Sequence, residues 1–495
     1  MSRFIRTVKT KSGATAVQIE TKRGRTRIGI EHIGSAHNET ELKILKALAH
    51  EKMHEGQLSF EVEKGGTAGL RLERSYSALL WDTLENIYGM LGFEELKDQV
   101  YKQLVLARII EPASKLDTIR ILGGLGLKTP SYTSMQRCLG KVIDEDYRGK
   151  ISKACFEYAA PAAMTLVLYD VTTLYFEAQR DDEYRKPGLS KERRLDPQIT
   201  VGLLVDSTGF PLEIRSFEGN CAEVKTILPV LAAFKDRHGL KNITVTADAA
   251  MLSSGNIEML ESLGYHYIIG SRLTKTPYEI EMYLSDEGAV FEDGQIFESK
   301  KTVTIAGKRT KRREIFQYRK KRAAVDLANI DKTVAKAQKI VDKKADIKRN
   351  RFLKIDGAIR EINHKLVAEA KRRAGIKGYI TDLNIPAQQV IDSYHQLFKV
   401  EKAFRMSKSD LKARPIFHHK RDSIEAHLTI VFTALAIARH IEMKTDMSLK
   451  KFIKMLEPVR AGVISIDGTV YPINPVIPNA VAELLSRLYQ TRKGC

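Results

Sequence analysis

One short segment of the chain combines an acidic residue with aromatic and basic residues at regular spacing. Tyr394, Glu401 and Lys408 follow one another at intervals of seven residues, and Arg405 lies one helical turn after Glu401. In a helix, a step of seven residues changes the direction of a side chain by only about 20°. These side chains would therefore share one helix face, where the carboxylate can bind a metal ion and the cations can bind phosphate. The alternative is an amphipathic surface helix with a solvated charged stripe.

Two aspartates upstream favour the metal-binding interpretation. Asp170 follows the apolar run 165–169, and Asp248 follows the run 243–246. Both runs have the composition of buried strands, so each aspartate is expected at the C-terminal end of a strand. Open α/β sheets bind ligands at that edge. Together with Glu401, the aspartates would supply three carboxylates, the minimum that holds two divalent cations around one phosphodiester.

Such a site is suited to phosphoryl transfer. One ion lowers the pKa of the attacking water or hydroxyl, and the other stabilises the leaving oxygen. Carboxylate oxygens favour Mg²⁺, for which Mn²⁺ can substitute, over softer metals. We therefore expect two Mg²⁺ ions per active site, with Asp170, Asp248 and Glu401 as the candidate metal ligands.

The elements that must position these residues form an α/β core. A hairpin around the turn 206–209 follows the first aspartate, and helices alternate with short strands on either side of the second. This order predicts a mixed sheet covered by helices. The acidic residue lies on a helix from 387 to about 412, followed by an apolar helix over 423–443. The other core elements are expected at 199–205, 210–216, 223–237, 254–263 and 267–269.

Changes in composition along the chain indicate five parts. A small β-meander of three strands comes first, then a helical region in which the pair of helices around 123–130 is a candidate DNA-binding unit. An insertion with strands at 295–305 and 313–319 and a lysine-rich helical stretch over 326–373 interrupts the catalytic core. The C-terminal part has a hairpin over 462–473. The predicted boundaries are 1–38, 39–160, 161–273 with 377–444, 274–376, and 445–495.

The charge is strongly positive and concentrated in the insertion. The chain has 81 lysines and arginines against 61 acidic residues, a net charge of +20. Residues 301–377 hold 25 basic and 8 acidic residues, or +17 of that balance. Neutralising phosphates and releasing counterions supplies most sequence-independent affinity for nucleic acid, so we expect DNA as the partner. A solubilising helix face is the alternative.

The cysteines and the apolar segments bear on location. Cys138, Cys155, Cys221 and Cys495 are scattered, which indicates neither a zinc site nor a disulfide framework. The N-terminus lacks the apolar core of a signal peptide, and the apolar run 428–438 is too short to span a bilayer. We expect a cytoplasmic protein that is not associated with a membrane.

The segments around the three carboxylates resemble one family, the DDE transposases of bacterial insertion sequences. The similar branch carries a Y-x2-R-x3-E-x6-K signature on an RNase H-like fold, and the resemblance covers about residues 160–440. It implies an RNase H-like mixed sheet, interrupted by the inserted β-plus-helical subdomain and preceded by the β-meander and the helical region. The similar segments, in chain order, are 168–177, 217–223, 246–256, 394–408 and Arg414-Pro415.

The resemblance implies catalysis by Asp170, Asp248 and Glu401, and it also implies roles for other residues of the signature. Tyr394 and Lys408 would lie near the backbone of the transposon end. At the position of the signature arginine this chain has Leu397, so one phosphate contact is missing. Either Arg405 or Lys399 replaces it, or the protein binds its transposon end more weakly.

The implied activity is cut-and-paste DNA transposition. The enzyme would cleave a strand at the terminal inverted repeats and transfer the freed 3′-hydroxyl to target DNA, as a homodimer that brings two ends together. Two other interpretations stay open at this point. One is a catalytically inactive, transposase-derived DNA-binding protein, and the other is an RNase H-like nuclease acting on RNA or branched DNA.

Overall fold

The computed structural model describes most of the chain in two compact units. The described residues are 2–489 without 11–12, 24–25, 37–40, 43–44, 47, 50–70, 160–165, 178–180, 189–195, 241, 250–253, 272, 287–288, 306–307, 345, 347, 357–358 and 467. Parts of the strand expected at 165–169, of the segment after Asp248 and of the C-terminal turn therefore lie outside them. One unit comprises Met1–Leu80 and Leu456–Asn479, and the other Trp81–Met455 and Ala480–Cys495.

The smaller unit contains two three-stranded antiparallel sheets. The first confirms the predicted meander, with β1 (Ser2–Lys9), β2 (Thr15–Arg23) and β3 (Thr26–Ala36). In the second, the C-terminal hairpin of β15 (Ala461–Ile466) and β16 (Thr469–Ile473) is also confirmed. Its third strand, β4 (Arg71–Tyr76), lies where helix was expected. That prediction was wrong because β4 pairs with β15, a partner so distant in sequence that local spacing does not reveal it.

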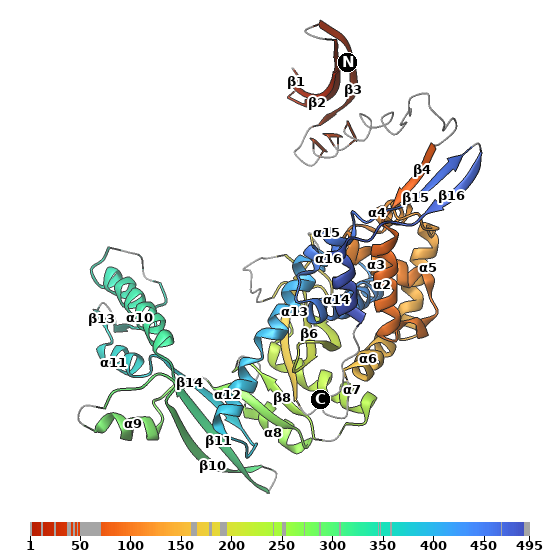
Figure 1. The fold of residues 1–495 in the computed structure, drawn as a ribbon. Helices are drawn as coiled ribbons and strands as arrows, with labels where there is room; N and C mark the ends of the chain where they lie inside the picture. Colours follow the sequence, from red (N-terminus) through yellow and green to blue (C-terminus); the bar gives the residue numbers. More distant parts are fainter. Residues whose placement is uncertain are drawn as a thin grey trace. The chain divides into compact units, whose positions relative to one another are not determined.

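The larger unit begins with a helical region (Figure 1). Side chains cap the N-termini of four of its helices: Asp98, Ser114, Ser131 and Asp146 accept from the backbone amides of Tyr101, Asp117, Ser134 and Gly149. Such N-caps are the start signals that the sequence carries for helices. The helices are α2 (Ala78–Met90), η1 (Phe93–Leu96), α3 (Gln99–Ile110), α4 (Lys115–Gly124), α5 (Tyr132–Asp144) and α6 (Tyr147–Tyr158).

An eight-stranded mixed sheet forms the centre of this unit, in the order β10-β11-β14-β9-β8-β5-β6-β7. The strands β5, β6 and β7 are antiparallel neighbours, while β8 and β9 are parallel to β5. This arrangement of the first five core strands is that of an RNase H-like domain, so the predicted fold class is confirmed. The core strands are β5 (Leu166–Tyr175), β6 (Gln198–Asp206), β7 (Pro211–Glu218), β8 (Thr244–Ala247) and β9 (His266–Ser271).

Helices cover this sheet and bury its apolar strands. All nine residues of β6 are buried. The long helix α14 (Arg421–Thr445) is the one helix of the described residues that is long and apolar enough to cross a membrane, and 94% of its apolar window is buried inside the protein. The remaining helices outside the insertion are η3 (Glu223–Lys225), α7 (Ile227–His238), α8 (Ser254–Ser262), α12 (Ala387–His395), α13 (Phe398–Ser409), α15 (Leu449–Leu456) and α16 (Asn479–Tyr489).

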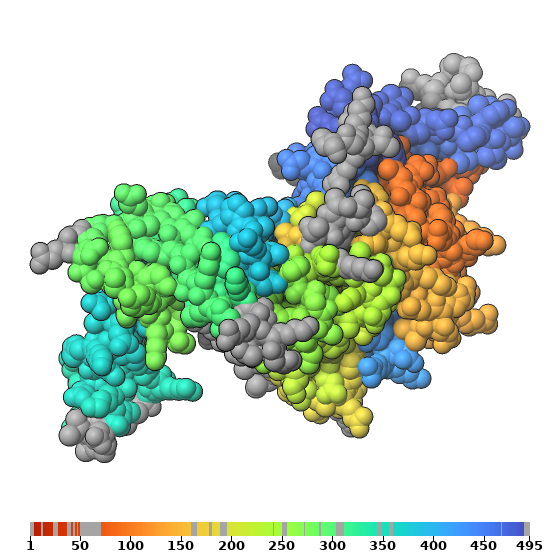
Figure 2. Space-filling view, turned by 90° about the horizontal axis from the view of Figure 1, so that it is seen from below, coloured from red at the N-terminus to blue at the C-terminus, as the bar shows by residue number. Residues whose placement is uncertain are grey.

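The insertion continues the catalytic sheet. Its strands β10 (Ile296–Ile305) and β11 (Lys308–Tyr318), both as predicted, pair onward to β14 (Ile376–Thr381) and β9. The continuous helical stretch expected over 326–373 is wrong. Helix α10 spans Lys320–Val341, and the alternating segments β12 (Leu353–Asp356) and β13 (Ile359–Ile362) form a hairpin before α11 (His364–Arg372). Figure 2 shows the surface of these elements in green to cyan. The helix α9 (Tyr278–Ser285) precedes β10.

The helix expected from 387 to about 412 is interrupted, which corrects the sequence-based expectation. A turn at Gln396 and Leu397 separates α12 from α13. Leu397 is buried, as are most apolar residues on both sides of the turn. The turn lets both helices place their apolar faces against the sheet, α12 over β8 and β9 and α13 over β5 and β6 (Figure 1). The single shared face of Tyr394, Glu401 and Lys408 is therefore lost.

Candidate active site

The two aspartates lie at neighbouring positions of adjacent parallel strands. In the pairing of β5 with β8, Tyr169 is opposite Ala247, so Asp170 and Asp248 are the next residues on the two strands. Adjacent strands are about 4.8 Å apart, which brings the two carboxylates to one place on the sheet. Asp170 lies in the middle of β5, not at its end, whereas Asp248 follows the last residue of β8.

The position of Asp170 in β5 directs it to the face covered by α13. Tyr169 points to the opposite face, where its hydroxyl donates to Thr226 at 2.8 Å. Thr172, two residues after Asp170, lines a small cavity together with Phe404 and Lys408 of α13. Because side chains alternate along a strand, Asp170 shares the face of Thr172.

Asp248 is held by a tyrosine of the signature segment. The hydroxyl of Tyr394 donates to Asp248 Oδ1 at 3.0 Å, and the backbone amide of Ala249 donates to the same oxygen at 2.7 Å. Burial and the negative charge of Asp248 raise the pKa of the Tyr394 phenol well above its ordinary value. The phenol therefore stays protonated at neutral pH and acts as a donor. Gly270 of β9 lets the ring lie close, since a Cβ there would be 2.6 Å from the hydroxyl oxygen.

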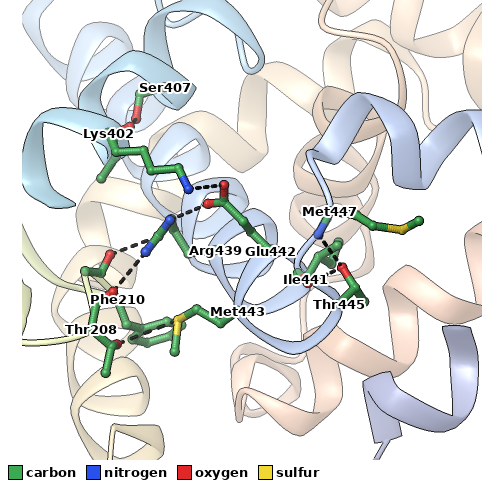
Figure 3. A network of polar contacts seen from close by, with 12 residues as sticks. Thr208, Phe210, Lys402, Ser407, Arg439, Ile441, Glu442, Met443, Thr445 and Met447 are labelled. Carbon is green, nitrogen blue, oxygen red and sulfur yellow. Dashed lines mark hydrogen bonds and ion pairs between the residues drawn. The ribbon is translucent and has the colours of Figure 1, made fainter. Parts of the chain in front are cut away.

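Helix α13, which carries Glu401, is anchored by ion pairs on its other side. Lys402 contacts Glu442 of α14 at 2.5 Å, and Glu442 also pairs with Arg439 (Figure 3). Arg439 in turn donates to the carbonyl oxygen of Thr208, in the turn between β6 and β7, at 2.9 Å. Glu401 itself is exposed, one helical turn before Phe404. This network fixes the helix that presents Glu401.

Of the three cations of α13 that were predicted to contact DNA, two lie on the Glu401 side of the helix and one does not. Arg405 is exposed one turn after Glu401, and Lys408 is partly buried beside β5. Lys399 donates to the carbonyl oxygen of Ser207, on the side of the β6–β7 turn. The geometry thus gives Arg405 and Lys408 positions on the Glu401 side of the helix and uses Lys399 to anchor it.

Two cations that the sequence did not single out, Lys377 and Arg322, lie near Asp248. The amine of Lys377 in β14 is 4.9 Å from the centre of the Tyr394 ring. Burial lowers the pKa of Lys377, with a further contribution from Arg322 that the charge of Asp248 opposes. Among 25 basic residues in one segment, no sequence pattern distinguishes these two. Their position depends on the pairing of β14 with β9, which spacing along the chain does not reveal.

The donor set is of the right chemistry for a hard divalent cation, but it is incomplete in this arrangement. Asp170 and Asp248 offer carboxylate oxygens, which suit Mg²⁺ or Mn²⁺. Within the described part of the chain, no three His, Cys, Asp or Glu side chains are grouped closely enough to hold an ion. The two aspartates fit such an ion, and Glu401, the third predicted carboxylate, is exposed on α13, which packs against β5 and β6.

Comparison with known proteins identifies the domain. The family model for the transposase DDE domain matches residues 161–437, more than half of the chain. No curated protein matches the chain in sequence. Among solved structures, the piggyBac transposase synaptic complex with hairpin DNA is similar at 10% identity and a TM-score of 0.37, over 77% of this chain and 69% of that one. The Mos1 transposase paired-end complex with left transposon end is similar at 14% identity and a TM-score of 0.17, over 45% of this chain and 66% of that one.

Proposed function

The chain belongs to the transposase DDE domain family, whose reaction is DNA transposition, and from this premise we propose that it is an insertion-sequence transposase of the cut-and-paste type. It would cleave a DNA strand at terminal inverted repeats and transfer the freed 3′-hydroxyl to target DNA. One observation carries the proposal: Asp170 in β5 and Asp248, directly after β8, follow the paired residues Tyr169 and Ala247, and Tyr394 of the signature segment bonds to Asp248.

Members of the family use divalent metal ions, and we propose two Mg²⁺ ions here, replaceable by Mn²⁺. Asp170 and Asp248 would hold them, with Glu401 as the third ligand. Bound ions would supply the acidity and charge stabilisation that phosphodiester cleavage requires. Tyr394 would orient the carboxylate of Asp248, as outer hydrogen bonds commonly do for metal ligands.

DNA would approach from the side of α13 and the insertion. Arg405 and Lys408 follow Glu401 along α13, and Lys408 lies next to β5. Their charges, with those of Tyr394's neighbours Lys377 and Arg322, would contact the backbone of the transposon end. We also propose a homodimer, which brings two ends together, and a cytoplasmic location on the nucleoid.

A second candidate function is a DNA-binding protein that has lost catalysis. Two observations favour it. Leu397, at the position of the signature arginine, is 9% exposed and packs into the core. Within the described residues, Glu401 is not grouped with both aspartates. Such a protein would bind the same ends through the basic insertion and would not cleave them.

Cleavage of DNA from the borders of the protein's own gene separates the two functions. Wild-type protein and the Asp170→Ala variant are incubated with the labelled DNA, with and without Mg²⁺. We expect nicking at the inverted repeat by the wild type with Mg²⁺ only, and no nicking by the variant. Tight binding by both proteins without metal-dependent cleavage would support the inactive DNA-binding protein instead.

A further inference from the structure

A cavity of about 540 Å³ lies next to Asp248, between the catalytic sheet and the helices of the insertion. Residues of α10, α11 and β14 line it, and Asp248 and Ser271 form its edge on the catalytic side. A volume of this size accommodates a small ligand or one unit of a polymer. None of the residues that carry the proposed cleavage, except Asp248, contributes to it.

The lining of this cavity is rich in cations. Arg322, Arg351, Arg373 and Lys377 line it, against two carboxylates, Asp248 and Asp326. Asp326 is largely engaged by its own neighbours, because it accepts from the amide of Gly375 at 3.0 Å and lies 3.5 Å from Arg322 Nε. The cavity therefore carries an excess of positive charge, which favours an anionic ligand.

Arg373 provides the clearest indication of a ligand. It is only 8% exposed, and its Nη1 donates to the carbonyl oxygen of Thr274 at 2.7 Å. Its Nη2 is buried and has no hydrogen-bond partner among the described residues. A buried guanidinium with an unused donor is costly, and the planar fork of arginine matches the oxygens of a phosphate. One branch of the fork is thus held by the protein, and the other has no partner among the described residues, although the side chain lines the cavity.

Lys377 joins this cavity to the candidate active site. It lines the cavity, its amine lies over the ring of Tyr394, and the hydroxyl of Tyr394 bonds to Asp248. A phosphate bound by Lys377 and Arg373 would therefore be a neighbour of the phosphodiester at the carboxylates. Leu397 leaves the signature position without a cation, and the insertion supplies cations on this side.

We propose that this cavity binds a backbone phosphate of the DNA strand that runs from the carboxylates toward the insertion, with Arg373, Lys377 and Arg322 as its ligands. This inference rests on the proposed function for the identity of the strand. The chemistry at the cavity is that of a phosphate ester, which a free nucleotide also carries. A free nucleotide is therefore the other possible ligand, and the experiment must distinguish it from the DNA strand.

The test measures binding without metal, so that it does not depend on cleavage. Full-length wild type and the variants Lys377→Gln, Arg322→Gln and Arg373→Lys are titrated with labelled border DNA at several salt concentrations. Arg373→Lys keeps the charge and removes the fork. Lys454→Gln is the control, since Lys454 is exposed on α15, lies outside the basic insertion and does not line the cavity. The unfolding transition of each variant is measured to verify that the variant folds.

We expect each of the two glutamine variants to weaken binding about tenfold and to reduce the salt slope by about one phosphate contact. Arg373→Lys should weaken DNA binding with an unchanged salt slope, and Lys454→Gln should change the affinity by about twofold at most. Equal affinities for the cavity variants and the control would overturn the proposal.

Titration with thymidine 5′-monophosphate distinguishes the sources of phosphate. We expect weak binding of this nucleotide, far below the affinity for DNA. Tight nucleotide binding by the wild type that is lost in Arg373→Lys would assign the cavity to a free nucleotide and overturn the assignment to the DNA strand. Failure of the proposed transposase would appear separately, as loss of metal-dependent cleavage with these binding results unchanged.

Discussion

Removal of the Tyr394 hydroxyl tests whether this residue positions Asp248. In Tyr394→Phe the ring keeps its place against Gly270, because phenylalanine has the same shape without the oxygen. The variant loses the 3.0 Å bond to Asp248 Oδ1, while the 2.7 Å bond from the Ala249 amide remains. The change therefore removes one donor of two without opening a cavity.

The expected magnitude follows from this geometry. A hydrogen bond to a charged group contributes about 1.5–3 kcal/mol. Asp248 is exposed, so water can replace the lost donor, and the lower end of that range applies. About 1.5 kcal/mol corresponds to roughly a tenfold weaker metal affinity, which is also typical when a partner of a metal ligand is removed.

The assay is calorimetric titration of Mn²⁺ into the metal-free proteins. Tyr379→Phe is the control, because the Tyr379 ring packs against Tyr394 at 5.0 Å and its hydroxyl contacts His395 instead of Asp248. We expect wild-type affinity in this control, a roughly tenfold loss in Tyr394→Phe and the largest loss in Asp248→Asn. Wild-type affinity in Tyr394→Phe together with lost binding in Asp248→Asn would refute the positioning role.

Three further variants test the surroundings of the site. Gly270→Ala should displace the ring of Tyr394, since the new Cβ would lie 2.6 Å from its hydroxyl oxygen, and should weaken Mn²⁺ binding as Tyr394→Phe does; unchanged binding in the same titration would contradict this. Glu442→Gln leaves Arg439, whose side chain is 5% exposed, without its carboxylate and should lower the free energy of unfolding by about 3 kcal/mol in a urea titration, whereas a loss within error would show that the network is dispensable. Burial and neighbouring cations lower the pKa of His418 to about 4, so the unfolded chain binds its proton between pH 6.5 and 4 while the folded protein does not. The free energy of unfolding should therefore fall as the pH is lowered through that range, by on the order of 1 kcal/mol from this group. Urea titrations at pH 7 and 5 should show a smaller fall in His418→Gln than in wild type.

Part of this site could be predicted from local sequence. The apolar runs before Asp170 and Asp248 predict strands, and the pairing of β5 with β8 brings both aspartates together. The acid-bearing segment was correctly predicted as helical. Its interruption was not predicted, because Gln396 and Leu397 are compatible with a helix and only packing against the sheet separates α12 from α13.

The cations near Asp248, Lys377 and Arg322, could not be predicted from the sequence for a different reason. Arg405 and Lys399 were expected to replace the signature arginine because they are near it in sequence. The structure also brings Lys377 to Tyr394 through the pairing of β14 with β9, across the insertion. Long-range pairing also explains β4, whose partner β15 lies near the other end of the chain. Spacing along the chain reports helix faces and strand ends, and it does not report such partners.

The central claim is that Asp170 and Asp248 hold the metal ions that cleave DNA, and exchange of the ligand atom tests it most directly. Asp170→Cys and Asp248→Cys replace a hard oxygen with a soft sulfur, which binds Mg²⁺ poorly and accepts Mn²⁺ more readily. On border DNA, both variants should lose cleavage with Mg²⁺ and regain part of it with Mn²⁺. Cleavage with Mg²⁺ at the wild-type rate in both variants would contradict the assignment of these two carboxylates.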